Sequence, residues 1–181
     1  VINSPVNSRV VEVYANIGDT VEVGTPLLKL DLQSIETDYQ KLLDEEQMKR
    51  YQLEQQQVND ETYFSDQQMQ IRIAEMKLDR MKADWQNERH LDSLGSGTAD
   101  QVRQAELAYT IGRMELEQLR QKVDNERKVR QADRRVRLLD LEIFRKGMAE
   151  MRRTLEDARI RSPHKAVLTF VNSQVGVRVS Q

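Results

Sequence analysis

Few side chains in this sequence could support catalysis or metal binding. The 181 residues include no cysteine, which excludes a disulfide framework and a thiolate metal site. The two histidines, His90 and His164, belong to different expected elements, so we interpret them as surface polar residues and not as ligands of one metal ion. Gly95 and Gly97 lack the following lysine of a phosphate-binding loop. We therefore predict a protein that is not an enzyme, with no catalytic residue, metal site or cofactor.

The composition indicates an elongated helical protein. Charged residues make up 32% of the chain and hydrophobic residues 38%, but aromatic residues only 5%, which is lean for one compact globule. The net charge of −2 gives no reason to expect a nucleic-acid partner. No apolar run is long enough to span a membrane. Because the chain begins at Val1 without a methionine, we expect that a targeting or anchoring segment has been removed.

The middle of the chain predicts a long helical hairpin. No proline occurs between Pro26 and Pro163, and proline is the residue that most strongly breaks helices. Two of the seven glycines fall in the segment 94–98, near the centre. We predict a helix over 33–93, a tip over 94–98 and a helix over 98–158. At a rise of about 1.5 Å per residue, each arm would be roughly 90 Å long and would bury a seam instead of a globular core.

Apolar residues on both arms recur at alternating spacings of three and four, which is typical of paired helices. On the first arm, the stripe near the tip is Ile71, Ala74, Leu78, Met81 and Trp85. On the second arm it is Val102, Ala105, Tyr109, Gly112, Leu116, Leu119 and Val123. We predict that the second stripe resumes, after a shift of phase, with Val129, Ala132, Val136, Leu139 and Ile143.

Between these stripes both arms carry few apolar residues. If the hairpin folds about Ser96, residues 55–62 face roughly 130–137, and both stretches are mainly polar. We predict a flexible or irregular point there, because few apolar contacts are available to hold the arms together. Ser65, followed three residues later by Gln68, could cap a second helix at this point.

Short β segments flank the hairpin, and they repeat one another. Residues 1–32 contain β-branched runs separated by glycine turns, which indicate strands. The matched positions, at one constant offset without gaps, include Pro5 with Pro163, Gly18 with Gly176 and Val21 with Val179. A repeat that is split by an insertion predicts two half-units that pack together. The second copy, 159–181, is shorter than the first, so we expect the β unit to be incomplete.

The split repeat, the Ser-Pro openings, the Gly-Asp turn at Gly18 and the inserted hairpin together resemble the HlyD-like membrane fusion protein family. These proteins are the periplasmic adaptors of tripartite efflux pumps and type I secretion systems. The resemblance implies an α+β fold, in which a long antiparallel coiled-coil hairpin, 33–158, is inserted between two halves of a lipoyl-like β-sandwich, 1–32 and 159–181.

The same resemblance implies a function and partners. The chain would belong to a non-enzymatic adaptor in the periplasm, anchored to the inner membrane by a segment absent from this chain. It would bridge an inner-membrane transporter and an outer-membrane channel protein for efflux or secretion. It would also form a homo-oligomer, commonly a hexamer, with the hairpins side by side.

The resemblance further implies that the hairpin tip binds the channel. Many family members carry an arginine there, a leucine four residues on and a serine seven residues beyond the leucine. Leu91 and Thr98 keep this spacing, with threonine in place of serine, whereas Asn87 stands where the arginine is expected. The predicted partner-binding residues are Arg89, Leu91, Leu94, Gly95, Gly97 and Thr98.

Two other functions stay open at this point. A structural coiled-coil spacer or tether would use the same hairpin but would bind no channel at its tip. A lipoyl or biotinyl carrier would present a modified lysine on the turn that joins the two half-motifs, and here the hairpin replaces that turn. Lys29 is the nearest lysine, and we interpret it as an ordinary strand residue.

Overall fold

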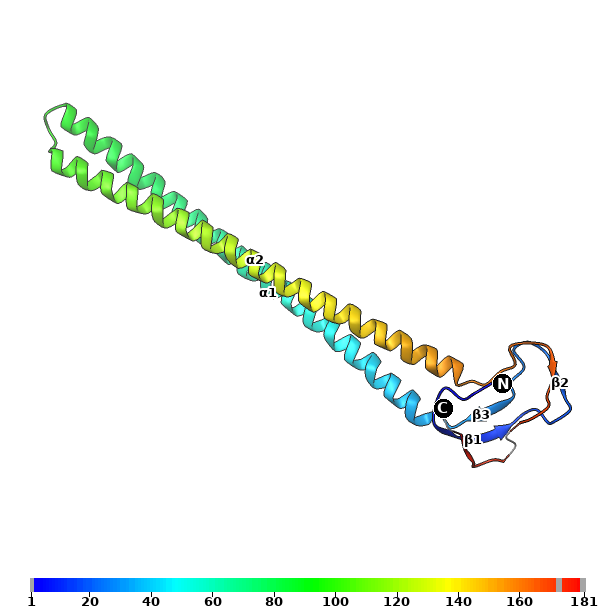
Figure 1. Cartoon of the computed structure of the whole chain (residues 1–181). Coiled ribbons are helices and arrows are strands. Elements are labelled where there is room, and N and C mark those ends of the chain that lie inside the picture. The colour runs from blue at the N-terminus through cyan, green and yellow to red at the C-terminus, as the bar shows by residue number, and fades with distance from the viewer. Residues whose placement is uncertain (1, 172–173, 180–181) are drawn as a thin grey trace. The chain divides into compact units, whose positions relative to one another are not determined.

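The chain folds into a long two-helix hairpin and two small β-sheets. The computed structural model describes residues 2–171 and 174–179. The elements in chain order are β1 (Ser8–Val13), β2 (Thr20–Val21), β3 (Leu28–Leu30), α1 (Gln33–Ser93), α2 (Ala99–Asp157), β4 (Ala166–Val167) and β5 (Arg178–Val179). The two helices pack against each other in opposite directions (Figure 1), which confirms the predicted hairpin. Within the described residues, no helix has an apolar stretch that could cross a membrane.

The contacts within the chain define two compact units. Unit 1 comprises Val1–Arg50 and Leu139–Gln181, and it contains all the strands and the adjoining ends of both helices. Unit 2 comprises Tyr51–Leu138, which is the remainder of the hairpin with its reversal.

Unit 1 contains two small antiparallel sheets. One has the strand order β3-β1-β5, and the other pairs β2 with β4. Each sheet therefore combines strands from before and after the hairpin. Buried side chains form one core, which consists of Val10, Ala15, Val21, Leu27, Leu30 and Ile160. Because Ile160 follows α2 in the sequence and the others precede α1, the two flanking segments stabilise each other through this core.

The hydrogen bonds of the two sheets follow the sequence repeat. Gly18 donates its backbone N–H to the carbonyl of Leu168, and the equivalent Gly176 donates to the carbonyl of Val10, both at 2.8 Å. Both glycines have positive φ angles, 95° and 88°, which residues with a Cβ rarely adopt. Equivalent positions of the repeat thus exchange backbone hydrogen bonds between the segments before and after the hairpin. The complete lipoyl-like sandwich stays a prediction.

In unit 2, one strict heptad line of α2 faces α1. The line contains Val102, Tyr109, Leu116 and Val123, all buried or half-buried. The α1 residues predicted for the seam near the tip, from Ile71 to Trp85, are half-buried as well. The Trp85 ring stacks on the Tyr109 ring, with centroids 5.6 Å apart. A Cβ at Gly112 would lie 2.8 Å from the Met81 sulfur, so glycine permits a close approach of the helices there.

The predicted continuation of the α2 stripe is wrong. Side chains that were expected in the seam are exposed, namely Val129, Ala132, Val136, Leu139 and Ile143. The heptad line from Val102 continues without a change of phase to Arg130, because paired helices keep one face toward each other. Val129 lies one residue earlier, which rotates its side chain by about 100° away from that position.

The predicted irregular point and the second helix start at Ser65 are also wrong, because α1 and α2 are each unbroken. Polar side chains link the helices in this stretch instead. Arg130 donates a hydrogen bond to Asp60 at 2.6 Å, and the Gln56 amide donates to Asp133 at 2.6 Å. Every α2 residue from 131 to 138 is exposed. Hydrogen bonds and ion pairs thus take the place of an apolar seam, and flexibility at this point stays a prediction.

Candidate functional site

The reversal between α1 and α2 is a tightly hydrogen-bonded turn within unit 2. The Leu91 carbonyl accepts hydrogen bonds from the backbone N–H groups of Ser96 and Gly97, at 3.0 and 3.1 Å. These bonds satisfy a carbonyl that the end of a helix would otherwise leave unpaired. Gly95 has a φ angle of 75°, and a Cβ at Gly97 would lie 2.7 Å from the backbone nitrogen of Asp92. Both glycines are therefore required by the backbone geometry of the turn.

Thr98 begins α2 as a helix cap. Its hydroxyl accepts the backbone N–H of Gln101 at 3.3 Å, and the Gln101 side chain accepts the backbone N–H of Thr98 at 3.2 Å. This reciprocal pair is a capping box, as the spacing of the two residues in the sequence indicates. The Thr98 hydroxyl also donates to the side-chain amide oxygen Oε1 of Gln101 at 3.0 Å. Its hydrogen-bonding capacity is thus largely used inside the turn.

Two leucines supply the apolar surface of the turn. Leu91 is 42% exposed and Leu94 is 65% exposed. A hydrogen-bonded turn holds these side chains at a fixed backbone position, so a partner could bind them without a large cost of ordering the loop. The turn therefore presents two exposed leucines on a hydrogen-bonded backbone.

Arg89 is not a free charge beside these leucines. Its guanidinium lies over the Trp85 ring, 5.3 Å from the centroid, and Trp85 in turn stacks on Tyr109. Of the six predicted site residues, Leu91, Leu94 and the two glycines belong to the turn, and Thr98 caps the helix that follows it. Arg89 belongs to an aromatic stack below the turn. The four-residue separation of Trp85 and Arg89, one helical turn, is a sequence signal for this contact.

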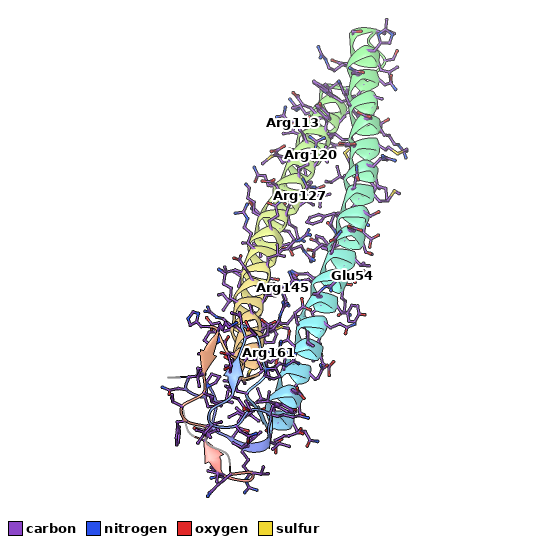
Figure 2. The ribbon with its side chains drawn as sticks, turned by 90° about the vertical axis from the view of Figure 1, so that its right-hand side faces the viewer. Glu54, Arg113, Arg120, Arg127, Arg145 and Arg161 are labelled. Atoms are coloured by element: carbon purple, nitrogen blue, oxygen red, sulfur yellow. The ribbon has the colours of Figure 1, made fainter. Side chains whose placement is uncertain are left out.

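Several arginines of α2 contact side chains along the hairpin. Arg113, Arg120 and Arg127 follow one another at seven-residue intervals along the helix (Figure 2). Arg120 donates to Glu75 at 2.6 Å, and the Arg127 guanidinium lies 5.1 Å from the Phe64 ring centroid. These interactions connect α2 to α1, so most of this row stabilises the helix pair.

The centre of unit 2 holds two groups with shifted pKa values, Arg130 and Asp133. The hydrogen bond to Asp60 raises the pKa of Arg130 above its ordinary value, with a further bond to Glu126 acting the same way. Hydrogen bonds from Arg137 and Gln56 lower the pKa of Asp133. Both pKa shifts stabilise the charged form of the side chain, which is the form that pairs across or along the helices. We therefore assign these groups to a structural network and not to acid–base catalysis.

His90 lies in unit 2 and His164 lies in unit 1. The backbone carbonyl of each histidine accepts a hydrogen bond of 2.6 Å, from Ser93 and from Ser162 respectively. Over residues 2–171 and 174–179, no group of three or more histidine or carboxylate side chains could hold a metal ion.

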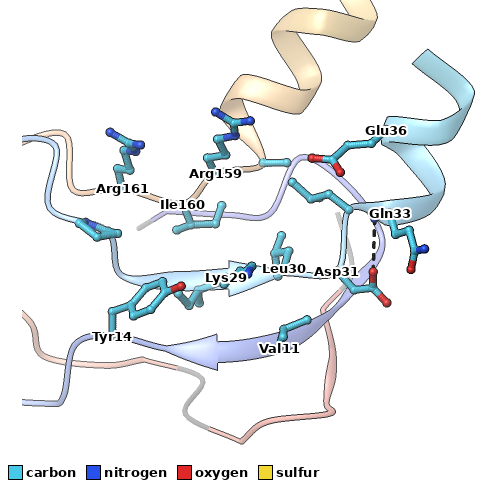
Figure 3. Close-up of a pocket in the computed structure, with 14 residues that line it drawn as sticks. Val11, Tyr14, Lys29, Leu30, Asp31, Gln33, Glu36, Arg159, Ile160 and Arg161 are labelled. Carbon is cyan, nitrogen blue, oxygen red and sulfur yellow. Dashed lines mark hydrogen bonds between the residues drawn. The ribbon is translucent and has the colours of Figure 1, made fainter. Parts of the chain in front are cut away.

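A hollow of about 640 Å³ lies in unit 1, and Lys29 is one of its lining residues (Figure 3). Lys29 lies within β3, opposite Glu12 of β1, and not on a turn as the attachment lysine of a carrier would. Figure 3 shows Ile160 pointing toward β3, whereas Arg159 and Arg161 point away from it. The charged ends around this hollow therefore do not converge on one ligand position.

Comparison with solved structures identifies the fold. No protein-family model and no curated protein sequence matches the chain. The soluble domain of LipC, a membrane fusion protein of a type I secretion system, is similar over 99% of this chain and 94% of its own, with a TM-score of 0.52 and 11% identity. The periplasmic adaptor protein EmrA matches with a TM-score of 0.43 and 16% identity, over 99% of this chain and 68% of its own.

MacA from Actinobacillus actinomycetemcomitans has a TM-score of 0.37 and 13% identity, and this chain, matched over 99% of its length, spans 44% of MacA. At such identities a likeness shows only the fold, and the likeness to LipC has a TM-score above 0.5. With its two-helix hairpin and the small sheets that flank it in sequence, the chain has the HlyD-like membrane fusion protein fold.

Proposed function

We propose that this chain is part of a periplasmic adaptor that bridges an inner-membrane transporter and an outer-membrane channel protein, for efflux or secretion. The observation that carries the proposal is the likeness to LipC over nearly the full length of both chains. LipC belongs to a secretion system, and a paired-helix hairpin suits such a bridge because its backbone hydrogen bonds are satisfied along its length.

The hairpin tip is the proposed docking site for the channel protein. Leu91 and Leu94 present exposed apolar surface on a turn whose backbone is fixed by hydrogen bonds. Thr98 and the two glycines act by shaping the turn, and Arg89 acts through its contact with Trp85. The leucines are thus the residues that we expect to touch the partner, and the others position them.

We propose that residues 1–32 and 159–181 form the two halves of a lipoyl-like unit and that residues 33–158 form the inserted hairpin. The backbone hydrogen bonds of Gly18 and Gly176 support this assignment, because the two glycines occupy matched positions of the repeat and each donates to the other segment. The adaptor would work as a homo-oligomer in the periplasm, and it would perform no chemistry itself.

The test compares tip variants with a matched control in cells that carry the complete export system. Leu91→Gln/Leu94→Gln should abolish cross-linking of the full-length adaptor to the outer-membrane channel protein and should reduce export. Leu107→Gln, which changes a 60% exposed leucine on α2 outside the turn, should leave both unchanged. If the tip variant cross-links and exports like the unmodified protein, the hairpin is a spacer without a docking tip.

A further inference from the structure

The central part of unit 2 presents two apolar stripes outside the seam. On α1, Tyr51 and Val58 lie one heptad apart, and they are 60% and 56% exposed. On α2, Val129 and Val136 lie one heptad apart, and they are 62% and 67% exposed. Seven residues correspond to about two helical turns, so each pair lies on one line along its helix. Isolated exposed apolar residues are common, but matched heptad pairs on both helices indicate a packing surface.

The seam within the chain is polar at the same level. Gln56 contacts Asp133, and Asp60 contacts Arg130, at positions where a coiled coil normally buries apolar side chains. The Oε1 atom of Gln56 is buried without a hydrogen-bond partner among the described residues. A hollow of about 650 Å³ is lined by both helices here. Val129 borders this hollow but is still 62% exposed, and Val136 and Val58 are exposed as well.

We propose that the two stripes pack against each other between copies of this chain. Tyr51 and Val58 of one copy meet Val129 and Val136 of the next, and this contact supplies the apolar packing that the central seam lacks.

Charged residues beside the stripes identify a second copy as the occupant. Glu54 and Glu61 lie one heptad apart beside the α1 stripe, and Figure 2 labels the first of them. Lys128 and Arg135 lie one heptad apart beside the α2 stripe. In an antiparallel hairpin, residues of the two helices that lie at the same level have numbers with a constant sum. The hydrogen-bonded pair Gln56 and Asp133 defines this sum. Glu54 with Arg135 and Glu61 with Lys128 have the same sum, so each of these pairs also lies at one level.

A second copy at the same level would therefore bring both acid–base pairs together without sliding along the helix axis. Charges at such flanking positions direct the choice and orientation of partners in coiled coils. Among the described residues, neither Glu54 nor Arg135 has an ion-pair partner within the chain, and both are exposed. A foreign helix would have to be basic to suit α1 or acidic to suit α2, whereas a second copy satisfies both.

This inference deepens the adaptor proposal by naming the face through which copies associate. Its test uses the chain alone, without transporter or channel, so its failure is distinct from a failure of tip docking.

The first experiment uses disulfide formation, for which the chain provides a clean background because it has no cysteine. Mild oxidation of the whole chain carrying Val58→Cys/Val129→Cys, which the proposed register places at nearly one level, should yield a ladder of covalent multimers on a non-reducing gel. The control Val23→Cys/Val175→Cys, at exposed valines of unit 1, should yield none. A disulfide within one chain would show that the two stripes face each other in the same hairpin, and this would overturn the proposal. Free thiols after oxidation would overturn it as well.

The second experiment measures self-association by light scattering over a range of protein concentrations. Val129→Ser/Val136→Ser should weaken association by about tenfold or more, since each valine loses its apolar burial. Val23→Ser/Val175→Ser should leave it unchanged. Glu54→Lys and Arg135→Glu should each weaken association, and the two together should restore it. The stripes are not the interface if the serine variant associates like the unmodified chain or if that chain is monomeric throughout. Failure of the charge swap to restore association would refute the pairing.

Discussion

Arg130 donates a hydrogen bond of 2.6 Å to Asp60 across the seam of unit 2, at the heptad position that Val123 occupies one repeat earlier. The two side chains are 28% and 18% exposed, so this ion pair is more enclosed than most others in the hairpin. The Arg130 guanidinium also lies 4.2 Å from the Tyr63 ring centroid. One arginine thus joins a carboxylate and an aromatic ring of α1, where a smaller apolar residue would contact fewer groups.

Removing one partner of this pair should destabilise the hairpin more than removing both. Asp60→Leu alone leaves Arg130 without its carboxylate on α1, and we expect a loss of about 1 kcal/mol in the free energy of unfolding. Asp60→Leu/Arg130→Leu should recover that loss or exceed the original stability, because apolar side chains suit a seam position. Urea unfolding followed by circular dichroism measures both. A double variant that is less stable than the single variant would show that the polar pair has no apolar substitute.

The turn glycine at 97 should tolerate no side chain. Gly97→Ala places a Cβ 2.7 Å from the backbone nitrogen of Asp92, and backbone cannot move aside as a flexible side chain can. We expect a loss of about 1–3 kcal/mol in the free energy of unfolding. Gly147→Ala is the matched control, since a Cβ in that part of α2 meets nothing within 4 Å. It should stabilise the helix by about 0.5–1 kcal/mol. Equal unfolding midpoints for the two variants would contradict this account of the turn.

The cap at Thr98 should depend on its hydroxyl group. Thr98→Ala removes the acceptor for the Gln101 N–H, with an expected cost of about 1 kcal/mol in the free energy of unfolding. Thr98→Ser keeps the hydroxyl and should remain close to the unmodified stability. Thermal unfolding of the three proteins distinguishes the cap from a simple loss of side-chain volume. A serine variant as unstable as the alanine variant would exclude the capping role.

The stability contributed by Asp133 should disappear in acid. Hydrogen bonds from Arg137 and Gln56 lower its pKa in the folded protein from the ordinary value of 3.8. A group with a lowered folded pKa stabilises the protein above its ordinary pKa, and the contribution is lost as pH falls through the folded value. The difference in unfolding midpoint between the unmodified chain and Asp133→Asn should therefore be largest above about pH 5 and should vanish toward pH 2. A difference that is constant across this range would show that Asp133 acts without its charge.

Much of the fold could be predicted because its signals are local. The absence of proline between Pro26 and Pro163 and the glycines near the centre predict two helices with one reversal, and α1 and α2 have that arrangement. The capping box of Thr98 with Gln101 follows from a three-residue spacing within a single helical turn. The equivalence of Gly18 and Gly176 follows from the repeat, and each hydrogen-bonds to the segment on the other side of the hairpin in sequence.

The central seam could not be predicted in this way. Apolar spacing alone places Val129 and Val136 in a seam, because a helix with two possible stripes carries the same local signal for both. The choice depends on which face α1 meets, and the heptad line that starts at Val102 settles it in favour of Arg130. The role of Arg89 likewise depends on Trp85, whose ring is itself held against Tyr109 of the other helix.

The sequence by itself determined the helices, their reversal, the cap and the split repeat, since each rests on propensities and spacings within a few residues or on direct similarity between segments. Only the tertiary structure decided that charged residues face inward and valines lie outside the seam at the centre of unit 2. The physical reason is that a continuous coiled coil keeps one face along its whole length. The packing of the flanking heptads therefore determines which face of α2 meets α1 at the centre, even though Val129 and Val136 are the more hydrophobic residues there.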